Sequence, residues 1–407
     1  MEAYEGVFRA NDKEIGVGVR SLGWMGRLHT RSYKAMSELF PELGAKVRLV
    51  VACDPIEETQ RLAVEVRGCE KAVADYQEVL SDPDGDVVSI CSPNFLHCVI
   101  AVAAAKAGKP YWIEKPMGAT ATESREIAQT AAQAWLNTAV GFNYRPNPPI
   151  EQAPQLIAEG KLGRITNVRC WLIADYASSP LGPYTWRYDR EKAGAGVVGD
   201  LMSHGVDLVQ YILRDRIGAV SALSDTFIKE RPIPTKAGVG HSGWEVSDEK
   251  KEVGNEDYVA MMVRFDSGVV GTLESSRVSV GPRAEYVVEV YGTKGSVRWN
   301  FEHLNDLEVC IGQDNGDIHG YVRSMANPHY PHFSRFQPGA GTSMGFDDMK
   351  AVECYQFLSG VLTGKQIAPS VADGWSAAEI DQATVASAAD GQWHEVAKVS
   401  GATTFDK

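Results

Sequence analysis

Apolar residues near the start of the chain recur with the spacings expected of strands and helices. Ile15, Val17 and Val19 alternate with glycine and predict a short strand. Residues 47–53 and 87–91 are almost continuously apolar, which is typical of strands buried on both faces of a parallel sheet. Amphipathic stretches that predict helices cover residues 56–66, 95–106 and a segment after Thr120. This alternation predicts a doubly wound parallel sheet.

Beyond Tyr144 the pattern changes to one helix followed by long strands. The helix is predicted over residues 150–159, and the strand pattern favours an antiparallel sheet. The predicted strands cover residues 165–174, 258–265, 269–276, 285–291 and 296–301. Residues 228–256 and 314–346 show neither period, and we interpret both as long loops that cover a substrate.

The length and these patterns together predict an α/β protein of two domains. A chain of 407 residues usually folds around more than one core. We expect an N-terminal tail over residues 1–13, the domain of the parallel sheet over 14–144 and a second α/β domain over 145–407.

Composition narrows the classes of function. Apolar residues make up 44% and charged residues 23%, as in ordinary globular proteins. The formal charge of −13 disfavours nucleic acids and anionic membranes as partners. No apolar stretch approaches the ~20 residues that span a bilayer, and residues 1–13 are too polar and acidic for a signal peptide. We therefore expect a cytoplasmic protein with no nucleic-acid or membrane partner.

Cysteine and histidine spacing gives no sign of a metal centre. The seven cysteines include no C-x-x-C pair, and their odd number favours reduced thiols over a disulfide framework. The nine histidines contain no H-E-x-x-H motif, although His329 and His332 lie three apart in a predicted loop. We expect no bound metal.

A glycine-containing turn between the first strand and the next helix is the first candidate for cofactor binding. Residues 21–26 read Ser-Leu-Gly-Trp-Met-Gly, which is the G-x-G-x-x-G pattern with serine first. Gly23 would let the backbone approach a pyrophosphate, which the helix amides can bind. Asp54, after the second strand, can accept hydrogen bonds from a ribose diol and would repel a 2′-phosphate, which favours NAD over NADP. The candidate residues are Ser21, Gly23, Trp24, Met25 and Asp54.

The turn has a simpler interpretation and one weakness. Residues 21–26 could form only a tight turn, with Asp54-Pro55 as a helix start. If Ser21 requires a positive φ, serine costs on the order of 1 kcal/mol more than glycine. We favour the dinucleotide site because the motif stands between a strand and a helix and is answered by Asp54.

Two further strand ends carry polar groups where open α/β sheets bind ligands. One continues as Ser92-Pro93-Asn94 and leads to His97, and the other continues as Glu114-Lys115-Pro116. The proline biases Lys115 to extended backbone and permits a cis peptide bond. The candidate cofactor contacts are Ser92, Pro93, Asn94, His97, Glu114 and Lys115.

Asp200 and His204 are the candidates for acid–base chemistry. They lie four apart in a helix predicted over residues 199–213 and would therefore share one face. Histidine suits a general base at neutral pH for alcohol oxidation. Lys115 would stabilise the developing alkoxide, and Asp200 would orient the hydroxyl. The simpler alternative is a carboxylate that complements the helix dipole and a histidine bound to a carbonyl.

Aromatic and basic residues in the second domain suit a sugar. Rings contact the C–H faces of sugars and polar side chains bind their hydroxyls, although the arginines could equally bind a carboxylate or sulfonate. The candidate substrate contacts are Tyr144, Arg145, Tyr176, Trp186, Arg187 and Tyr330, with Lys115, Asp200 and His204. Trp186 and Arg187 are also candidates for cofactor contacts; alternatively, Trp186 belongs to the core and Arg187 to a surface ion pair.

Several motifs match one known family. They are residues 23–29, Ser92-Pro93-Asn94 with His97, Glu114-Lys115-Pro116, residues 194–204 with Asp207, and the stretches 265–268 and 291–296. In these motifs the chain resembles the glucose-fructose oxidoreductase, inositol dehydrogenase and MocA (Gfo/Idh/MocA) family from about Ile15 to Val396. Residues 179–188 and 372–374 look most like those of levoglucosan and inositol dehydrogenases.

The resemblance implies a fold, a cofactor and a catalytic set. It implies a nicotinamide-binding Rossmann domain, followed by an α/β domain whose large, mainly antiparallel open sheet walls the active site and mediates homo-oligomer contacts. It also implies Lys115, Asp200 and His204 as catalytic residues. Ser21 departs from the usual first glycine, which bears on cofactor affinity.

Three functions remain as hypotheses at this point. The first is NAD-dependent oxidation of a secondary hydroxyl in a sugar, glycoside or cyclic polyol. The second is an NAD-requiring glycosidase that oxidises the sugar, eliminates the aglycone, adds water and reduces the product without net NADH. The third is a catalytically silent redox sensor, which the complete acid–base set disfavours.

Overall fold

The chain divides into two compact units, each assembled from separate stretches of sequence. A computed structural model describes residues 13–236, 238, 243–312, 320–400 and 403–404. Unit 1 comprises Met1–Gly118, Glu123–Asn143 and Gly345–Val371, and unit 2 comprises Ala119–Thr122, Tyr144–Met344 and Ala372–Lys407. The units change over between residues 143 and 144, beside the expected domain boundary, but residues 345–371 belong to unit 1. Of the predicted tail, residues 1–12 lie outside the described residues.

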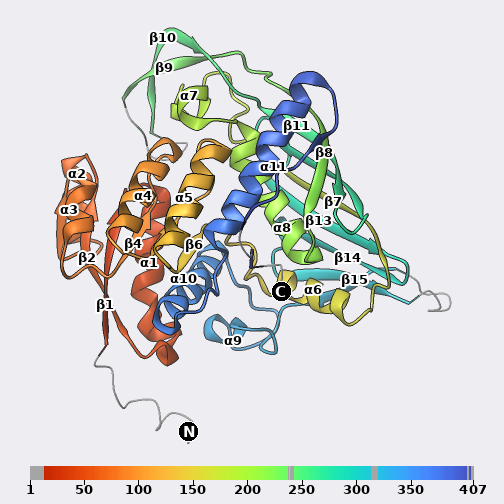
Figure 1. The fold of residues 1–407 in the computed structure, drawn as a ribbon, viewed down its shortest axis with the longest axis horizontal. Helices are drawn as coiled ribbons and strands as arrows, with labels where there is room; N and C mark the ends of the chain where they lie inside the picture. Colours follow the sequence, from red (N-terminus) through yellow and green to blue (C-terminus); the bar gives the residue numbers. More distant parts are fainter. Residues whose placement is uncertain (1–12, 237, 239–242, 313–319, 401–402, 405–407) are drawn as a thin grey trace, which may run out of the picture. The chain divides into compact units, whose positions relative to one another are not determined.

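Unit 1 contains a sheet of six parallel strands (Figure 1). The strands are β1 (Glu14–Arg20), β2 (Lys46–Cys53), β3 (Lys71–Val73), β4 (Val87–Ile90), β5 (Tyr111–Ile113) and β6 (Thr138–Val140). Their order is β3-β2-β1-β4-β5-β6, so the direction of winding reverses beside β1. The prediction of a doubly wound parallel sheet is confirmed, and ligands of such sheets bind beside this reversal, at the carboxyl ends of the strands.

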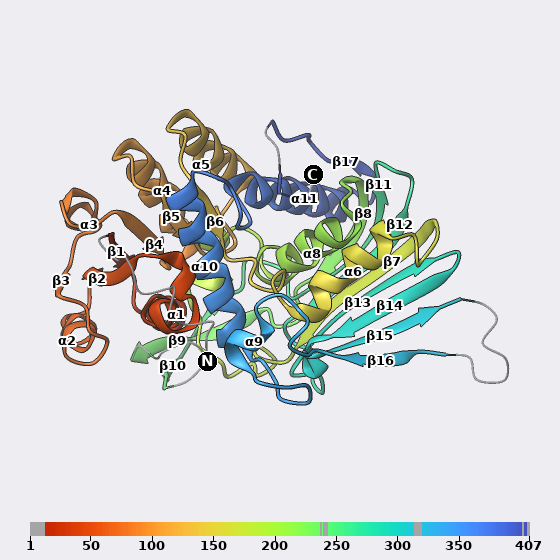
Figure 2. The ribbon, with the colours of Figure 1, turned by 90° about the horizontal axis from the view of Figure 1, so that it is seen from below.

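Helices connect the strands of unit 1, and one more helix arrives from near the end of the chain. The connecting helices are α1 (Trp24–Leu39), α2 (Glu57–Glu65), α3 (Tyr76–Ser81), α4 (His97–Lys106) and α5 (Ala121–Gln133). The late helix is α10 (Phe346–Thr363), which lies beside α1 (Figure 2). The Tyr355 ring stacks on Phe40 with 4.3 Å between ring centroids, and Asp347 pairs with Arg31 at 2.8 Å. Helix α10 was not predicted from the sequence, because its buried face includes charged residues.

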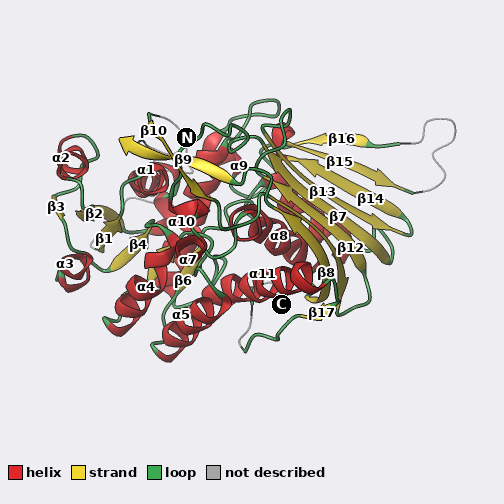
Figure 3. Ribbon diagram, turned by 90° about the horizontal axis from the view of Figure 1, so that it is seen from above, coloured by secondary structure: helices red, strands yellow, loops and turns green. Residues whose placement is uncertain are grey.

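Unit 2 is built on a nine-stranded sheet (Figure 3). The strand order is β16-β15-β14-β13-β7-β12-β11-β8-β17, and only the β7–β12 pair is parallel. The strands are β7 (Ile165–Ala174), β8 (Ile217–Asp225), β11 (Tyr258–Phe265), β12 (Val270–Ser276), β13 (Ala284–Gly292), β14 (Gly295–Asn300), β15 (Asp306–Ile311), β16 (Val322–Met325) and β17 (His394–Glu395). The prediction of a large, mainly antiparallel sheet is confirmed.

One face of this sheet is covered by helices, and Figure 3 shows α8 and α11 on that side. The helices of unit 2 are α6 (Pro148–Ala158), α7 (Arg190–Ala193), α8 (Ser203–Leu213), α9 (Phe333–Phe336) and α11 (Val371–Asp390). Ser387 of α11 accepts a hydrogen bond from the Ala222 amide of β8 at 2.9 Å. In β11, Met261 is buried against this layer, whereas Met262 is 50% exposed on the other face. In the described part of the chain, no helix is long and apolar enough to cross a membrane.

Within residues 228–256 the described part contains two paired strands, which corrects the prediction of a long loop. Strands β9 (Glu230–Lys236) and β10 (Glu245–Glu252) pair in an antiparallel two-stranded sheet. The period-two pattern was hidden because nearly all of β10 is exposed and polar, and β9 contains two prolines. Buried Arg231 anchors this strand pair by donating to the carbonyls of Ala177 and Ser179. In the second predicted loop, residues 314–319 lie outside the described residues and the remainder contains β16 and α9.

Candidate active site

The glycine-containing turn of unit 1 has the geometry of an anion site. β1 ends at Arg20 and α1 begins at Trp24, with Gly23 in an extended conformation between them. Among the described residues, no side chain caps the amides at the start of α1, and its first turn contains no acidic residue. A Cβ atom on Gly23 would meet no described atom within 4 Å. The space and the uncapped amides fit a pyrophosphate.

Ser21 adopts the left-handed backbone that this position normally reserves for glycine. Its φ is 69°, and its hydroxyl accepts a hydrogen bond from Arg20 at 2.9 Å. The helix start packs tightly on the turn, because a Cβ atom on Gly26 would lie 1.8 Å from the Ser21 carbonyl oxygen. Because Ser21 has a positive φ, serine carries a conformational cost at this position that glycine would not.

Asp54 is held at the end of β2 beside the same turn. One carboxylate oxygen accepts the Leu22 amide at 3.0 Å, and the other accepts the Ile56 amide at 3.1 Å. These bonds orient the carboxylate and leave lone pairs for further donors, as a ribose diol would require. The turn, the helix start and Asp54 together fit a dinucleotide.

His97 joins the two other strand-end segments that the sequence singled out. Its ring nitrogens lie 2.7 Å from the Ser92 carbonyl oxygen and 3.0 Å from the Pro116 carbonyl oxygen. Burial lowers the pKa of His97, and a neutral imidazole can donate to only one of these carbonyls. The ring therefore braces the segments after β4 and β5. The Ser92 hydroxyl is buried and makes no hydrogen bond to the described residues, so it can serve a ligand.

Glu114 and Lys115 follow β5 directly, and the Lys115–Pro116 peptide bond is cis. The Glu114 side chain is 8% exposed and binds His29 and Lys350 within unit 1. In the described structure, its carboxylate is thus engaged in a buried ion-pair cluster. A direct cofactor contact by Glu114 stays a prediction, whereas Lys350 and His29 were not found from the sequence.

Asp200 and His204 lie where a π-helical turn meets α8 in unit 2. Residues Val198–Met202 are π-helical and α8 begins at Ser203, which corrects the prediction of one regular helix over residues 199–213. A π turn takes in an extra residue, so the four-residue spacing does not by itself place both side chains on one face. Such turns often occur at functional sites, and sequence periodicity does not reveal them.

The Asp200 carboxylate and the His204 ring are each held by tyrosines. Tyr176, just after β7, donates its hydroxyl to Asp200 at 2.6 Å. Burial and the Asp200 charge raise the pKa of Tyr176 far above its usual range, so the hydroxyl keeps its proton. The Tyr144 ring meets His204 edge to face with 4.9 Å between centroids, and Tyr286 donates to the His204 carbonyl at 2.7 Å. The sequence singled out the Tyr176 ring as a surface for sugar stacking. The contact with Asp200 is made instead by the hydroxyl of Tyr176.

Arg145 lies in a buried ion-pair network. Its guanidinium donates to Asp207 at 2.9 Å, to Asp373 at 3.1 Å and to the Thr404 hydroxyl at 2.6 Å. The residue is only 4% exposed. The sequence placed Arg145 among hydroxyl donors to substrate, but these contacts tie α8, α11 and the end of the chain together.

The remaining candidates of unit 2 are dispersed. Trp186 and Arg187 lie in a short 3-10 turn, Trp186–Tyr188, with the guanidinium carbon 4.6 Å from the indole centroid. Both are partly exposed, as a ligand contact requires. The Tyr330 hydroxyl donates to Gln152 of α6 and lies 3.3 Å from the Ser324 hydroxyl. Within their units, the structure brings together Tyr176 with Asp200, Tyr144 with His204, and His97 with Ser92.

The sequence and the structure were compared with known protein families, proteins and solved structures. Residues 15–142 match the family model described as "Oxidoreductase family, NAD-binding Rossmann fold", and residues 150–298 match "GFO/IDH/MocA C-terminal domain". The chain is 34% identical to levoglucosan dehydrogenase of Pseudarthrobacter phenanthrenivorans, over 95% of this chain and 100% of that protein. It is 25% identical to myo-inositol 2-dehydrogenase of Thermotoga maritima, over 74% of this chain and 79% of that protein. A solved structure of levoglucosan dehydrogenase with NADH and levoglucosan matches with a TM-score of 0.89 and 32% identity, over 95% of this chain and 100% of the other.

Proposed function

Since the chain belongs to the GFO/IDH/MocA oxidoreductase family and carries its NAD-binding Rossmann fold, we propose that it oxidises a secondary hydroxyl of a sugar, glycoside or cyclic polyol. Levoglucosan and the inositols are the first substrates to test, because relatives of 34% and 25% identity are named for them. The observation that carries the proposal is the arrangement at the π-helical turn, where Tyr176 fixes Asp200 and Tyr144 packs on His204.

The protein's own groups supply binding, orientation and proton transfer. NAD, when bound, supplies the hydride acceptor. The amides at the start of α1 would hold its pyrophosphate, and Asp54 would bind a ribose. His204 takes the proton from the substrate hydroxyl, Lys115 stabilises the alkoxide charge, and Asp200 orients the hydroxyl.

The substrate contacts follow from the same proposal. Trp186 and Arg187 are partly exposed and can meet a sugar or the cofactor, and Tyr144 and Tyr330 stay candidates beside them. We place Arg145 outside this set, because a substrate that drew on its donors would leave Asp207 or Asp373 buried without its ion-pair partner.

The catalytic assignment predicts the behaviour of two variants. Lys115→Ala and His204→Ala should each lower kcat by at least about a hundredfold, because each removes a group that acts on the reacting hydroxyl. The NAD dissociation constant, measured by fluorescence titration, should stay within severalfold of wild type. Lys106→Ala and His394→Ala remove the same residue types from the surface and should leave kcat unchanged. Near-normal turnover by Lys115→Ala or His204→Ala contradicts the assignment.

A glycosidase working through transient oxidation would use the same groups. Lys115 and His204 could serve oxidation, elimination, water addition and reduction alike, with no net NADH. We place the dehydrogenase first because two relatives, matched over 95% and 74% of this chain, are named dehydrogenases. An aryl glycoside tells the two apart, since only the glycosidase releases the phenol without accumulating NADH.

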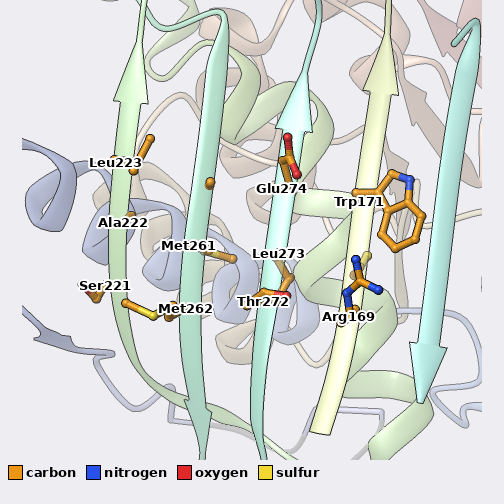
Figure 4. Close-up of a pocket in the computed structure, with 12 residues that line it drawn as sticks. Arg169, Trp171, Ser221, Ala222, Leu223, Met261, Met262, Thr272, Leu273 and Glu274 are labelled. Atoms are coloured by element: carbon orange, nitrogen blue, oxygen red, sulfur yellow. The ribbon is translucent and has the colours of Figure 1, made fainter. Parts of the chain in front are cut away.

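We also propose that the open face of the nine-stranded sheet joins two copies of this chain in a homo-oligomer. Leu223 and Met262 are 60% and 50% exposed on it, beside a shallow hollow of about 350 Å³ (Figure 4). Arg169 pairs with Glu289 across the same face at 3.0 Å. Exposed apolar side chains and charges of both signs let one face pair with a copy of itself.

A further inference from the structure

Four ionisable side chains of unit 1 are buried together behind the end of β5. The Lys350 ammonium of α10 lies 2.6 Å from Glu114 and 2.8 Å from Glu353. His29 of α1 contacts the same Glu114 oxygen at 2.8 Å. Lys350 and Glu353 are fully buried, although Lys350 stands 236 positions from Glu114 in the sequence.

The surrounding packing leaves the Glu114 carboxylate little freedom. A Cβ atom on Gly141 would lie 2.6 Å from a Glu114 oxygen, so only glycine fits there without displacing the carboxylate. The Trp112 ring stacks on His29 with 3.5 Å between centroids and lies 5.2 Å from the Lys350 nitrogen. The Glu114 amide is bonded to the Ile90 carbonyl at 3.0 Å, so backbone and side chain are both fixed.

Charge balance makes Lys350 the central member of this cluster. Burial lowers the pKa of His29 to about 4, so its ring is neutral near pH 7. Burial raises the pKa of Glu353 to about 7, whereas Lys350 and His29 hold the pKa of Glu114 well below its usual range against its burial. Lys350 is thus the cation that keeps Glu114 ionised inside the protein.

Stability alone gives a weak reason for such a cluster. The cost of desolvating buried charges often equals or exceeds their attraction, and apolar replacements of similar volume are often neutral or stabilising. The contact with Glu114 provides a different reason, because the next residue in the chain is Lys115.

We propose that Lys350 is a positioning residue for Lys115: by holding the Glu114 side chain, it fixes the Glu114-Lys115-Pro116 segment at the end of β5. The inference rests on the proposed function, in which Lys115 stabilises the alkoxide. It also gives a role to α10, which belongs to unit 1 although it lies in the last sixth of the chain. In this proposal α10 supplies the side chain that fixes the segment after β5.

The test removes the Lys350–Glu353 pair in two backgrounds. Lys350→Met/Glu353→Gln is made in the full-length wild-type protein and in the Glu114→Gln variant. In the wild-type background, kcat should fall between about ten- and hundredfold, the loss that misplacement of a reacting group produces. The Michaelis constants should stay within severalfold, because no binding contact is removed. In the Glu114→Gln background, the same pair of substitutions should leave kcat unchanged, because Lys350 acts through Glu114.

A fold-level effect would give a different result. If the substitutions lower kcat by the same factor in both backgrounds, or leave it unchanged in wild type, the inference is overturned. Melting temperatures monitor folding, and the triple variant, which lacks all three charges, is expected to stay folded. Failure of the proposed function would appear separately, as full turnover by Lys115→Ala.

A second measurement needs no turnover. The rate at which the Lys115 amine reacts with acetic anhydride, relative to Lys106 in the same digest, reports on the surroundings of Lys115. The inference predicts that Lys350→Met/Glu353→Gln changes this rate ratio in the wild-type background and not in the Glu114→Gln background. The same ratio in all four proteins overturns it.

Discussion

Some non-glycine residues have a positive φ, and the carboxyl group of α6 lies in surroundings that disfavour its charge. We predict the effect of substitutions at three of these positions. Ser21 has a positive φ at the cofactor turn, and exposed Trp135 has one after α5. Glu151 of α6 is partly buried, and one of its carboxylate oxygens is buried without a hydrogen-bond partner among the described residues.

Ser21→Gly should raise the free energy of unfolding by about 1 kcal/mol, because glycine adopts the left-handed backbone without steric cost. The strain belongs to the turn itself, so the NAD dissociation constant should change by less than about threefold. Trp135→Gly is the control, since it relieves the same backbone geometry far along the sequence from the turn. Denaturant melts and NAD titrations measure both quantities. Tighter NAD binding without added stability would show that the strain arises only on binding.

Glu151→Gln should change how stability depends on pH. Burial raises the pKa of Glu151 to about 8 from an ordinary value of 4.5. Between these values the folded chain holds a proton that the unfolded chain has lost, so stability falls as pH rises from 4.5 to 8. The neutral glutamine removes this loss.

The Glu151→Gln protein should match wild type near pH 4.5 and exceed its stability above pH 8 by up to about 5 kcal/mol. Thermal melts across this range measure the difference. Exposed Glu159→Gln, at the end of the same helix, should follow the wild-type curve. A constant offset of Glu151→Gln at every pH would contradict the assignment.

At the scale of elements, the sequence predicted the strands whose pattern is set by burial alone. β7 and β11 occupy the predicted ranges because buried and exposed residues alternate along them. The β9–β10 strand pair was missed because both of its faces are largely polar, and α10 because it buries Lys350 and Glu353. Periodicity reports which side chains avoid water, so it fails where charged groups are buried in pairs.

The candidate site could be placed on the fold only in part. Motifs singled out Gly23, Asp54 and Lys115, and the structure places each of them just after a strand of the parallel sheet, because these positions follow from the order of strands and helices. The partners Lys350 and Tyr176 depend on tertiary contacts between distant segments. Local sequence patterns do not predict such contacts. For the same reason, the π-helical turn before α8 was predicted as part of a regular helix.

The turn that follows β7 carries Tyr176, and we predict the effect of Tyr176→Phe on catalysis. Removing the hydroxyl deprives Asp200 of a 2.6 Å donor, so we expect kcat to fall about tenfold. If Tyr176 positions Asp200, kcat should fall while the Michaelis constant for sugar changes little. If the ring served only as a sugar platform, phenylalanine would keep it, and both constants should stay near their wild-type values. Tyr184→Phe, in the same unit, is the control and should keep wild-type kinetics. Initial rates over a range of sugar concentrations separate the two roles.

At the scale of the whole molecule, both units depend on segments that the chain supplies out of order. Unit 1 requires Gly345–Val371, and unit 2 continues with Ala372–Lys407. The Arg145 network likewise binds Thr404 near the end of the chain to the start of unit 2. Neither unit is a continuous piece of sequence, so truncation at residue 144 would remove α10 from the parallel sheet.

If two copies associate through the open face of the nine-stranded sheet, one charged substitution on that face should weaken the association. Met262→Glu places a carboxylate at the exposed centre of β11 and should shift the protein to a smaller assembly, because a desolvated charge opposes association. Val64→Glu, on α2 of unit 1, is an exposed apolar control and should leave the mass unchanged. Light scattering coupled to size exclusion measures both. An unchanged mass for Met262→Glu would place the interface elsewhere.

The most direct test of the account is whether net oxidation of a sugar accompanies reduction of NAD. Wild-type protein is incubated with NAD and each candidate sugar or polyol, and NADH absorbance is compared with the ketone found by mass spectrometry. The account predicts one NADH for each ketone formed, and neither product with Lys115→Ala or His204→Ala. Glycoside cleavage at constant NADH, or equal NADH formation by the variants, would contradict it.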